Sequence, residues 1–200
     1  MTASAVSRCS VALFVAATTL SACSFRDDPN GHGSAGEKSD PVGLELQTTK
    51  AHYPAGDVPQ LSMVLRNNGS RECSLPSTAI GAAEVVSVQR DGVALIGRPN
   101  RVYLYDGVAG AVAGSLRNVA PGESITVPLD IERSPNGIPE IVSTGEEAGG
   151  ARTTSWTLDQ PGVYRIIVVV SPATGVDRPD IAPKCEATSA EAEIGFEVEP

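Results

Sequence analysis

The chain has few of the side chains that carry most enzyme chemistry. It holds two histidines, and only His52 falls in the part that we expect to fold. The sequence contains no His-Glu-x-x-His, Cys-x-x-Cys, Gly-x-Ser-x-Gly or phosphate-binding P-loop motif. Because these patterns mark common metal, redox, hydrolase and nucleotide sites, we expect a protein that is not an enzyme and that has no metal or other cofactor.

Basic side chains are also scarce. Lysine and arginine number 15 against 24 aspartate and glutamate residues, which gives a formal net charge of −9. Nucleic acids and anionic lipid surfaces both bind proteins through clusters of positive charge. The composition therefore argues against nucleic acid as a partner. It also argues against attachment to a membrane by electrostatic attraction to anionic lipids.

Nor is any apolar run long enough to span a bilayer, which takes about 20 residues. Residues 11–17 form a shorter apolar run after the positive charge of Arg8, and small residues follow it. This three-part order is typical of an export signal.

The segment Leu20-Ser21-Ala22-Cys23 resembles the lipobox of bacterial lipoproteins. The resemblance implies that residues 1–22 are a signal peptide and that the thiol of Cys23 carries a lipid. It also implies that the protein is anchored at the extracytoplasmic face of the cell membrane, durably so if two or more acyl chains are attached. The alternative is an ordinary signal peptide followed by a free or disulfide-bonded cysteine.

The next segment, up to residue 43, has almost no apolar side chains and many turn formers. Such a segment buries too little to offset the entropy of ordering it. We expect residues 23–43 to be the lipidated cysteine and a flexible tether, followed by one folded domain, residues 44–200.

Two cysteines, Cys73 and Cys185, remain in this expected domain. Cysteines of exported proteins meet an oxidising compartment, where they pair. We predict a Cys73–Cys185 disulfide, and the alternative is two unrelated thiols.

From residue 44 onward, short runs alternate apolar and polar residues between turn signals. The clearest stripes are Leu61, Met63 and Leu65, and then Ile125, Val127, Leu129 and Ile131. No segment shows helical periodicity. The pattern predicts an all-β fold, an antiparallel β-sandwich of about seven to nine strands.

Three details of this sandwich follow from local patterns. Residues 163–170 are apolar at nearly every position, which favours a central strand buried on both faces. Asn67-Asn68-Gly69-Ser70 and Arg90-Asp91-Gly92 are hairpin signals. Residues 135–150 contain prolines and several glycines and are expected to form a loop.

The segment from Leu158 to Tyr164 resembles the tyrosine corner of immunoglobulin-like domains, in which a tyrosine bonds back to the backbone just upstream. Residues 44–171 also resemble the bacterial intracellular proteinase inhibitor family, an immunoglobulin-like domain. The shared motifs are Tyr53-x-x-Gly56, Arg90-Asp91-Gly92, Pro121-Gly122-Glu123-Ser124, Trp156 and Pro161-Gly162-x-Tyr164. The resemblance implies an immunoglobulin-like sandwich with Trp156 in its core, and it makes an exported protease inhibitor the alternative function.

The leading interpretation is a membrane-anchored, non-enzymatic binding or interaction module, whose partner is a protein or glycan of the cell envelope. Binding would use loops at one end of the sandwich, within residues 134–150 and 171–184. The polar residues in question are Ser134, Glu146, Glu147, Asp177 and Asp180. The acidic pairs among them lack EF-hand spacing, so we expect solvated charge rather than a Ca²⁺ site.

Residues 134–150 would also be the bait loop of a protease inhibitor. A third possibility, an enzyme or metal carrier, requires a site assembled from scattered residues.

Overall fold

Short strands dominate the computed structural model, which describes residues 41–102, 107–147, 150–170, 178–186 and 190–200. Residues 38–200 form one compact unit. Among the described residues there is one helix, α1 (Gly107–Ser115), and nine strands have five residues or more. These strands are β1 (Val42–Thr48), β3 (Leu61–Asn67), β5 (Ala83–Arg90), β7 (Arg98–Val102), β9 (Ser124–Pro128), β11 (Pro139–Glu147), β12 (Gly150–Thr157), β13 (Gly162–Val170) and β14 (Glu191–Glu199). The shorter strands are β2 (His52–Pro54), β4 (Cys73–Pro76), β6 (Val93–Ala94), β8 (Leu116–Val119) and β10 (Ile131–Arg133).

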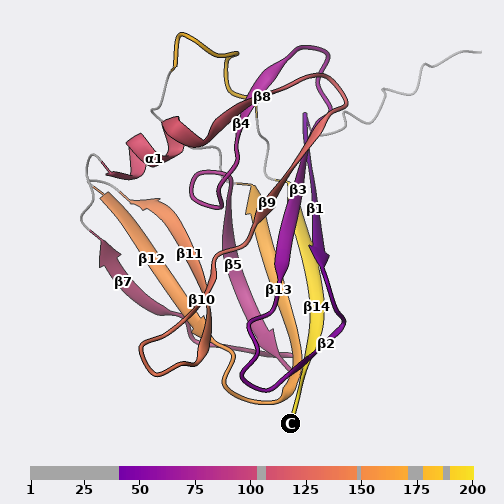
Figure 1. Cartoon of the computed structure of the whole chain (residues 1–200), viewed down its shortest axis with the longest axis vertical. Helices are drawn as coiled ribbons and strands as arrows, with labels where there is room; N and C mark the ends of the chain where they lie inside the picture. Colours follow the sequence, from indigo (N-terminus) through magenta and orange to yellow (C-terminus); the bar gives the residue numbers. More distant parts are fainter. Residues whose placement is uncertain (1–40, 103–106, 148–149, 171–177, 187–189) are drawn as a thin grey trace, which may run out of the picture. The chain divides into compact units, whose positions relative to one another are not determined.

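Two sheets form the frame of the domain (Figure 1). One has the order β1-β3-β9 and the other the order β2-β14-β13-β5-β6. Neighbouring strands are antiparallel except β2, which runs parallel to β14. In the lettering of immunoglobulin domains these are strands A-B-E and A′-G-F-C-C′, so the predicted fold class, an all-β immunoglobulin-like sandwich, is confirmed.

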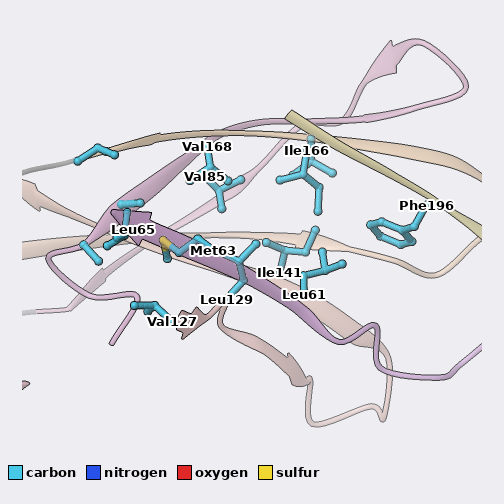
Figure 2. Packing of buried hydrophobic residues seen from close by; sticks show 14 of the residues in the cluster. Leu61, Met63, Leu65, Val85, Val127, Leu129, Ile141, Ile166, Val168 and Phe196 are labelled. Carbon is cyan, nitrogen blue, oxygen red and sulfur yellow. The ribbon is translucent and has the colours of Figure 1, made fainter. Parts of the chain in front are cut away.

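Apolar side chains from the two sheets meet in one core (Figure 2). On β3, Leu61, Met63 and Leu65 alternate with more exposed residues and are buried as predicted. They belong to the same cluster as Ile166 and Val168 of β13. Burial of a side chain of this size stabilises the fold by about 1.5–3 kcal/mol relative to leaving it in water.

The stripe predicted for residues 125–131 faces the core and divides between two sheets, with Ile125 and Ile131 partly buried. Val127 of β9 and Leu129 are buried. Ile131 begins β10, which belongs to a third sheet of order β10-β11-β12-β7. The chain therefore changes sheet while it keeps the alternation that marks it as a strand.

The predicted loop at residues 135–150 is wrong, because most of it is the strand β11. Ile141 pairs with Ile131 on one side and with Trp156 on the other. Ile141 and Trp156 are both buried, which confirms the core position expected for the tryptophan. Pro139 stands at the first position of the strand, where a missing N–H is tolerated.

Strand β13 is central, as predicted, with β14 and β5 on its two sides. The prediction that it is buried on both faces is wrong: Val163 is 55% exposed, and Arg165 forms an exposed ion pair with Glu193 at 3.0 Å. On the inner face, the Tyr164 hydroxyl donates a hydrogen bond of 2.8 Å to the Gln160 carbonyl. This bond is the tyrosine corner that the sequence predicts.

The two hairpin signals have different outcomes. Asp91 and Gly92 have φ values of 50° and 77° and connect β5 to β6, which confirms the hairpin. Asn67 does not begin a hairpin, because β3 pairs with β1 and β9 and the chain continues into β4, which pairs with β8. The side-chain amide of Asn67 is buried and donates hydrogen bonds to the Arg71 and Val119 carbonyls.

Candidate binding site in the apical lobe

The elements that do not belong to the immunoglobulin frame are insertions in its connections. Strand β4 lies between β3 and β5, α1 and β8 lie between β6 and β9, and residues 178–185 lie between β13 and β14. We call β4, α1, β8 and residues 178–185 the apical lobe. Figure 1 shows β4, β8 and α1 at the end of the domain opposite the C-terminus.

Alternation along β4 gives this strand two faces with different surroundings. Leu75 belongs to the main core, and Cys73 packs against the same core. Ser74 lies between them in the sequence, so its side chain points to the opposite face. Its partner in the antiparallel ladder with β8 is Asn118. Ser74 and Asn118 therefore lie on the face that is turned away from the main core.

Residues 183–185 run alongside β4 and are held there by three links. The Ser74 N–H donates to the Pro183 carbonyl at 2.8 Å, and the Cys185 N–H donates to the Ser74 carbonyl at 3.1 Å. A disulfide joins Cys73 and Cys185, which confirms the predicted pair. The disulfide therefore connects the β3–β5 and β13–β14 connections of the frame.

A small second core fills the lobe. Val112 of α1 and Leu116 of β8 are buried together, and Ile80, Ala113 and Ile181 pack against them. No sequence pattern predicts α1, since its residues GVAGAVAGS carry no amphipathic stripe. The helix is instead positioned by the packing of Val112 and Leu116, which only the tertiary structure supplies.

A hollow with a volume of about 290 Å³ lies between β4, β8 and residues 178–184. Its described lining is largely apolar, with side chains such as Leu116 and Ile181 and two prolines. The polar side chains of this lining are those of Ser74, Arg178 and Lys184, so no carboxylate belongs to it. The lining residues are Ser74, Leu116, Arg178, Pro179, Ile181, Ala182, Pro183 and Lys184.

Arg178 is held in place at the edge of the hollow. Its guanidinium donates hydrogen bonds to the Asp180 carboxylate and a bond of 3.1 Å to the Ala113 carbonyl. Hydrogen bonding between the two side chains raises the pKa of Arg178 and lowers the pKa of Asp180. Both groups are therefore ionised at neutral pH, and Arg178 ties residues 178–184 to the C-terminal turn of α1.

The Ser74 hydroxyl is the unusual polar group of the hollow. Ser74 is 1% exposed, and no described residue offers its Oγ a hydrogen-bond partner. Ser143 of β11 is also buried, but its Oγ accepts a hydrogen bond of 2.9 Å from the Val85 N–H. A buried hydroxyl without a partner costs about 1–3 kcal/mol, so Ser74 lowers the stability of the free domain.

The structure places the polar residues chosen from the sequence in different parts of the domain. Ser134 is in the turn between β10 and β11, where its Oγ accepts a hydrogen bond from the Ile138 N–H at 3.2 Å. Glu146 and Glu147 end β11, so they are strand residues and not loop residues. Asp180 is in the apical lobe, paired with Arg178. Asp177 lies outside the described residues.

Other predicted positions carry no evidence of chemistry. His52 is exposed and lies 3.1 Å from the Glu197 carboxylate on the neighbouring strand. The described part of the chain holds no group of three or more histidine, cysteine or acidic side chains placed to bind a metal. Cys23 and residues 24–40 of the expected tether lie outside the described residues. Val42 and Gly43, which the sequence assigned to the tether, begin β1. Within the described ranges, no helix has the length and apolar character needed to cross a membrane.

The sequence predicted only part of this site. Residues 178–184 belong to the loop predicted for binding and contribute six of the lining residues. Ser74 was missed, although it lies between Cys73 and Leu75, two residues that face the core. A polar residue inside such a short apolar run was the available signal, but the pattern alone does not say whether its hydroxyl has a partner.

Comparison with known proteins does not assign the chain to a family. No family model matches it, and no curated protein matches it. A CARDB domain of a Pyrococcus furiosus protein, solved by crystallography in complex with di-metal ions, is 14% identical with a TM-score of 0.34, over 80% of this chain and 93% of that chain. A solution NMR structure of the same domain is also 14% identical, with a TM-score of 0.32, over 80% of this chain and 94% of that chain. The fold assignment therefore rests on the strand order itself.

Proposed function

We propose that this protein is a lipid-anchored lipoprotein of the bacterial cell envelope that acts as a non-enzymatic binding module. The apical lobe is its binding site, and its partner is a protein or glycan of the envelope. The observation that carries the binding role is the hollow of about 290 Å³, whose walls a disulfide holds together.

The position of the hollow supports this role. In immunoglobulin variable domains the B–C and F–G loops lie at the same end and bind ligands. Here the corresponding connections, β3–β5 and β13–β14, supply β4 and residues 178–185. Rigid scaffolds commonly present their binding residues on such connections.

The lipid anchor is supported by the sequence. The lipobox-like Leu20-Ser21-Ala22-Cys23 and the polar segment that follows it fit a lipid and a tether. The Cys73–Cys185 disulfide fits an exported protein, since disulfides persist in oxidising compartments.

Filling the hollow tests the binding role. Ala182 lines the hollow and has a small side chain, so Ala182→Phe should occupy much of the space. We expect immobilised residues 24–200, which keep every described residue, to retain an envelope partner from a membrane-fraction extract. The Ala182→Phe variant should retain it at least tenfold less. Mass spectrometry and glycan analysis measure the recovery.

The matched control is Ala94→Phe, because Ala94 is exposed on β6, outside the apical lobe. This variant should recover the partner as the unmodified chain does, and both variants should keep the unmodified thermal midpoint within a few degrees. Equal recovery by all three chains, or no specific recovery by any, contradicts the proposed binding site.

Replacing the lipidated cysteine tests the anchor. We expect Cys23→Ala to move the protein from the membrane fraction to the soluble extracytoplasmic fraction or to leave its signal uncut, because no thiol remains to carry the lipid. Fractionation and mass spectrometry of the N-terminus measure the outcome. Cys9→Ala is the control and should change neither result. An unmodified residue 23 in the native protein contradicts the proposal.

A further inference from the structure

The Ser74 hydroxyl is buried and has no hydrogen-bond partner in the described structure. Native proteins rarely bury a polar group without a partner, and those that do occur need an explanation. Alanine would fill the same place on β4 without a polar atom. A group that binds in the hollow could supply the hydrogen-bond partner that the Ser74 hydroxyl lacks in the free domain.

The size of the hollow limits what enters it. Pockets that enclose whole small-molecule ligands commonly measure about 300–1,000 Å³. At about 290 Å³ the hollow has room for a group of about the size of one amino-acid residue. Its Leu116, Ile181 and proline lining favours an apolar group.

The charge of the lining favours an anion. The whole chain has nine more acidic than basic residues, yet the described lining has two basic side chains, Arg178 and Lys184, and no acidic one. Although Asp180 partly neutralises Arg178, a guanidinium has five N–H donors, and the described bonds to Asp180 and Ala113 use three of them. Ser74 belongs to the same lining, and its buried hydroxyl is a further donor without a partner.

We propose that the hollow binds an apolar group of about one residue in size that carries a carboxylate, and that Ser74 donates a hydrogen bond to it. This inference rests on the proposed function and names the chemistry of its ligand. Two sources share this chemistry: the apolar C-terminal residue of a partner polypeptide, and a free branched-chain acid.

A titration with matched small ligands tests the chemistry. The probes are N-acetyl-leucine, its uncharged analogue N-acetyl-leucinamide, and 4-methylpentanoate, added to residues 24–200 labelled with ¹⁵N. We expect N-acetyl-leucine to shift the amide resonances of Ser74 and of residues 180–185, and to bind at least tenfold more tightly than the amide. Hexapeptides that end in leucine, with a free or an amidated C-terminus, separate the two sources. If the hexapeptide with a free C-terminus binds more tightly than 4-methylpentanoate, the natural ligand is a polypeptide. If 4-methylpentanoate binds more tightly, the natural ligand is a free acid.

Ser74→Ala is the decisive variant, and Ser143→Ala is its matched control. We expect Ser74→Ala to weaken N-acetyl-leucine binding about tenfold while its urea midpoint stays equal or rises, because the removed hydroxyl has no partner in the free domain. Ser143→Ala should lower the urea midpoint, since it leaves the Val85 N–H without an acceptor, and should leave binding unchanged.

The outcomes separate this inference from the proposed function. Equal binding of the acid and the amide overturns the carboxylate preference, and unchanged binding by Ser74→Ala overturns the role of Ser74. Absence of binding by every probe overturns the ligand chemistry. In each of these cases the proposed binding role is still tested separately. That test is whether the native chain recovers an envelope partner and the Ala182→Phe variant does not.

Discussion

The Cys73→Ala/Cys185→Ala variant should unfold with a free energy about 4 kcal/mol lower than that of the native chain. The two cysteines are 112 residues apart in the sequence. In the chain-entropy model, closing a loop of this length stabilises the folded state by about 4–5 kcal/mol, because it restricts the unfolded chain. Urea denaturation followed by the fluorescence of Trp156, the single tryptophan, measures the change.

Reductant supplies the matched control for this prediction. Dithiothreitol should shift the native chain to the midpoint of the double variant, and it should leave the double variant unchanged. The double variant should also lose binding in the hollow, since residues 183–185 then lose their covalent link to β4 and are held by weaker contacts such as the two described backbone hydrogen bonds. A double variant as stable as the native chain contradicts the structural role of the disulfide.

The second large effect is expected at Asn67, whose side chain fastens the end of β3 to the apical lobe. Its Nδ2 donates to the Arg71 carbonyl at 2.8 Å and to the Val119 carbonyl at 2.9 Å. Its Oδ1 accepts from the Gly69 N–H at 2.9 Å. Asn67→Ala removes all three bonds at a position that is 1% exposed. We expect a loss of about 3 kcal/mol in the free energy of unfolding, because buried backbone groups are left without partners.

Two variants sharpen the test of Asn67. Ser70→Ala changes an exposed residue of the same connection and should cost less than about 0.5 kcal/mol, as is usual for surface positions. Asn67→Asp keeps the acceptor for Gly69 but sets an oxygen against two carbonyl oxygens, so it should cost at least as much as alanine. An Asn67→Ala variant within about 0.5 kcal/mol of the native chain shows that the predicted network does not stabilise the fold.

Local chemistry explains which structural features the sequence predicts correctly. The hairpin at Arg90-Asp91-Gly92 depends on residues that tolerate positive φ, and its neighbours do not alter that preference. The tyrosine corner joins Tyr164 to a carbonyl only four residues upstream. The disulfide follows from two cysteines in the expected exported domain. The hairpin and the tyrosine corner depend on few neighbouring residues, so distant packing changes them little. The disulfide joins residues 112 apart in the sequence and was predictable because the expected domain has two cysteines.

Features decided by distant partners are the ones that sequence patterns miss. Gly145 suggested a loop, but it lies in β11, where the carboxylate of Glu84 on β5 packs against it. A Cβ atom at position 145 would lie 2.7 Å from Oε1 of Glu84. Asn67 is of a residue type that is common in turns, yet its side-chain amide joins β3 to the end of β8 by a hydrogen bond. In both cases a partner far away in sequence sets the role of the residue.

The sequence by itself determined the alternation of the strands, because this follows from residue type and spacing. It also indicated the pairing of Cys73 with Cys185 and, by resemblance, the tyrosine corner. Only the tertiary structure decided that β4, β8 and residues 178–184 surround a hollow whose lining includes Ser74, and that the Ser74 hydroxyl is buried without a partner. The physical reason is that burial and hydrogen-bond satisfaction belong to pairs of groups that folding brings together. No single segment of the chain carries that information.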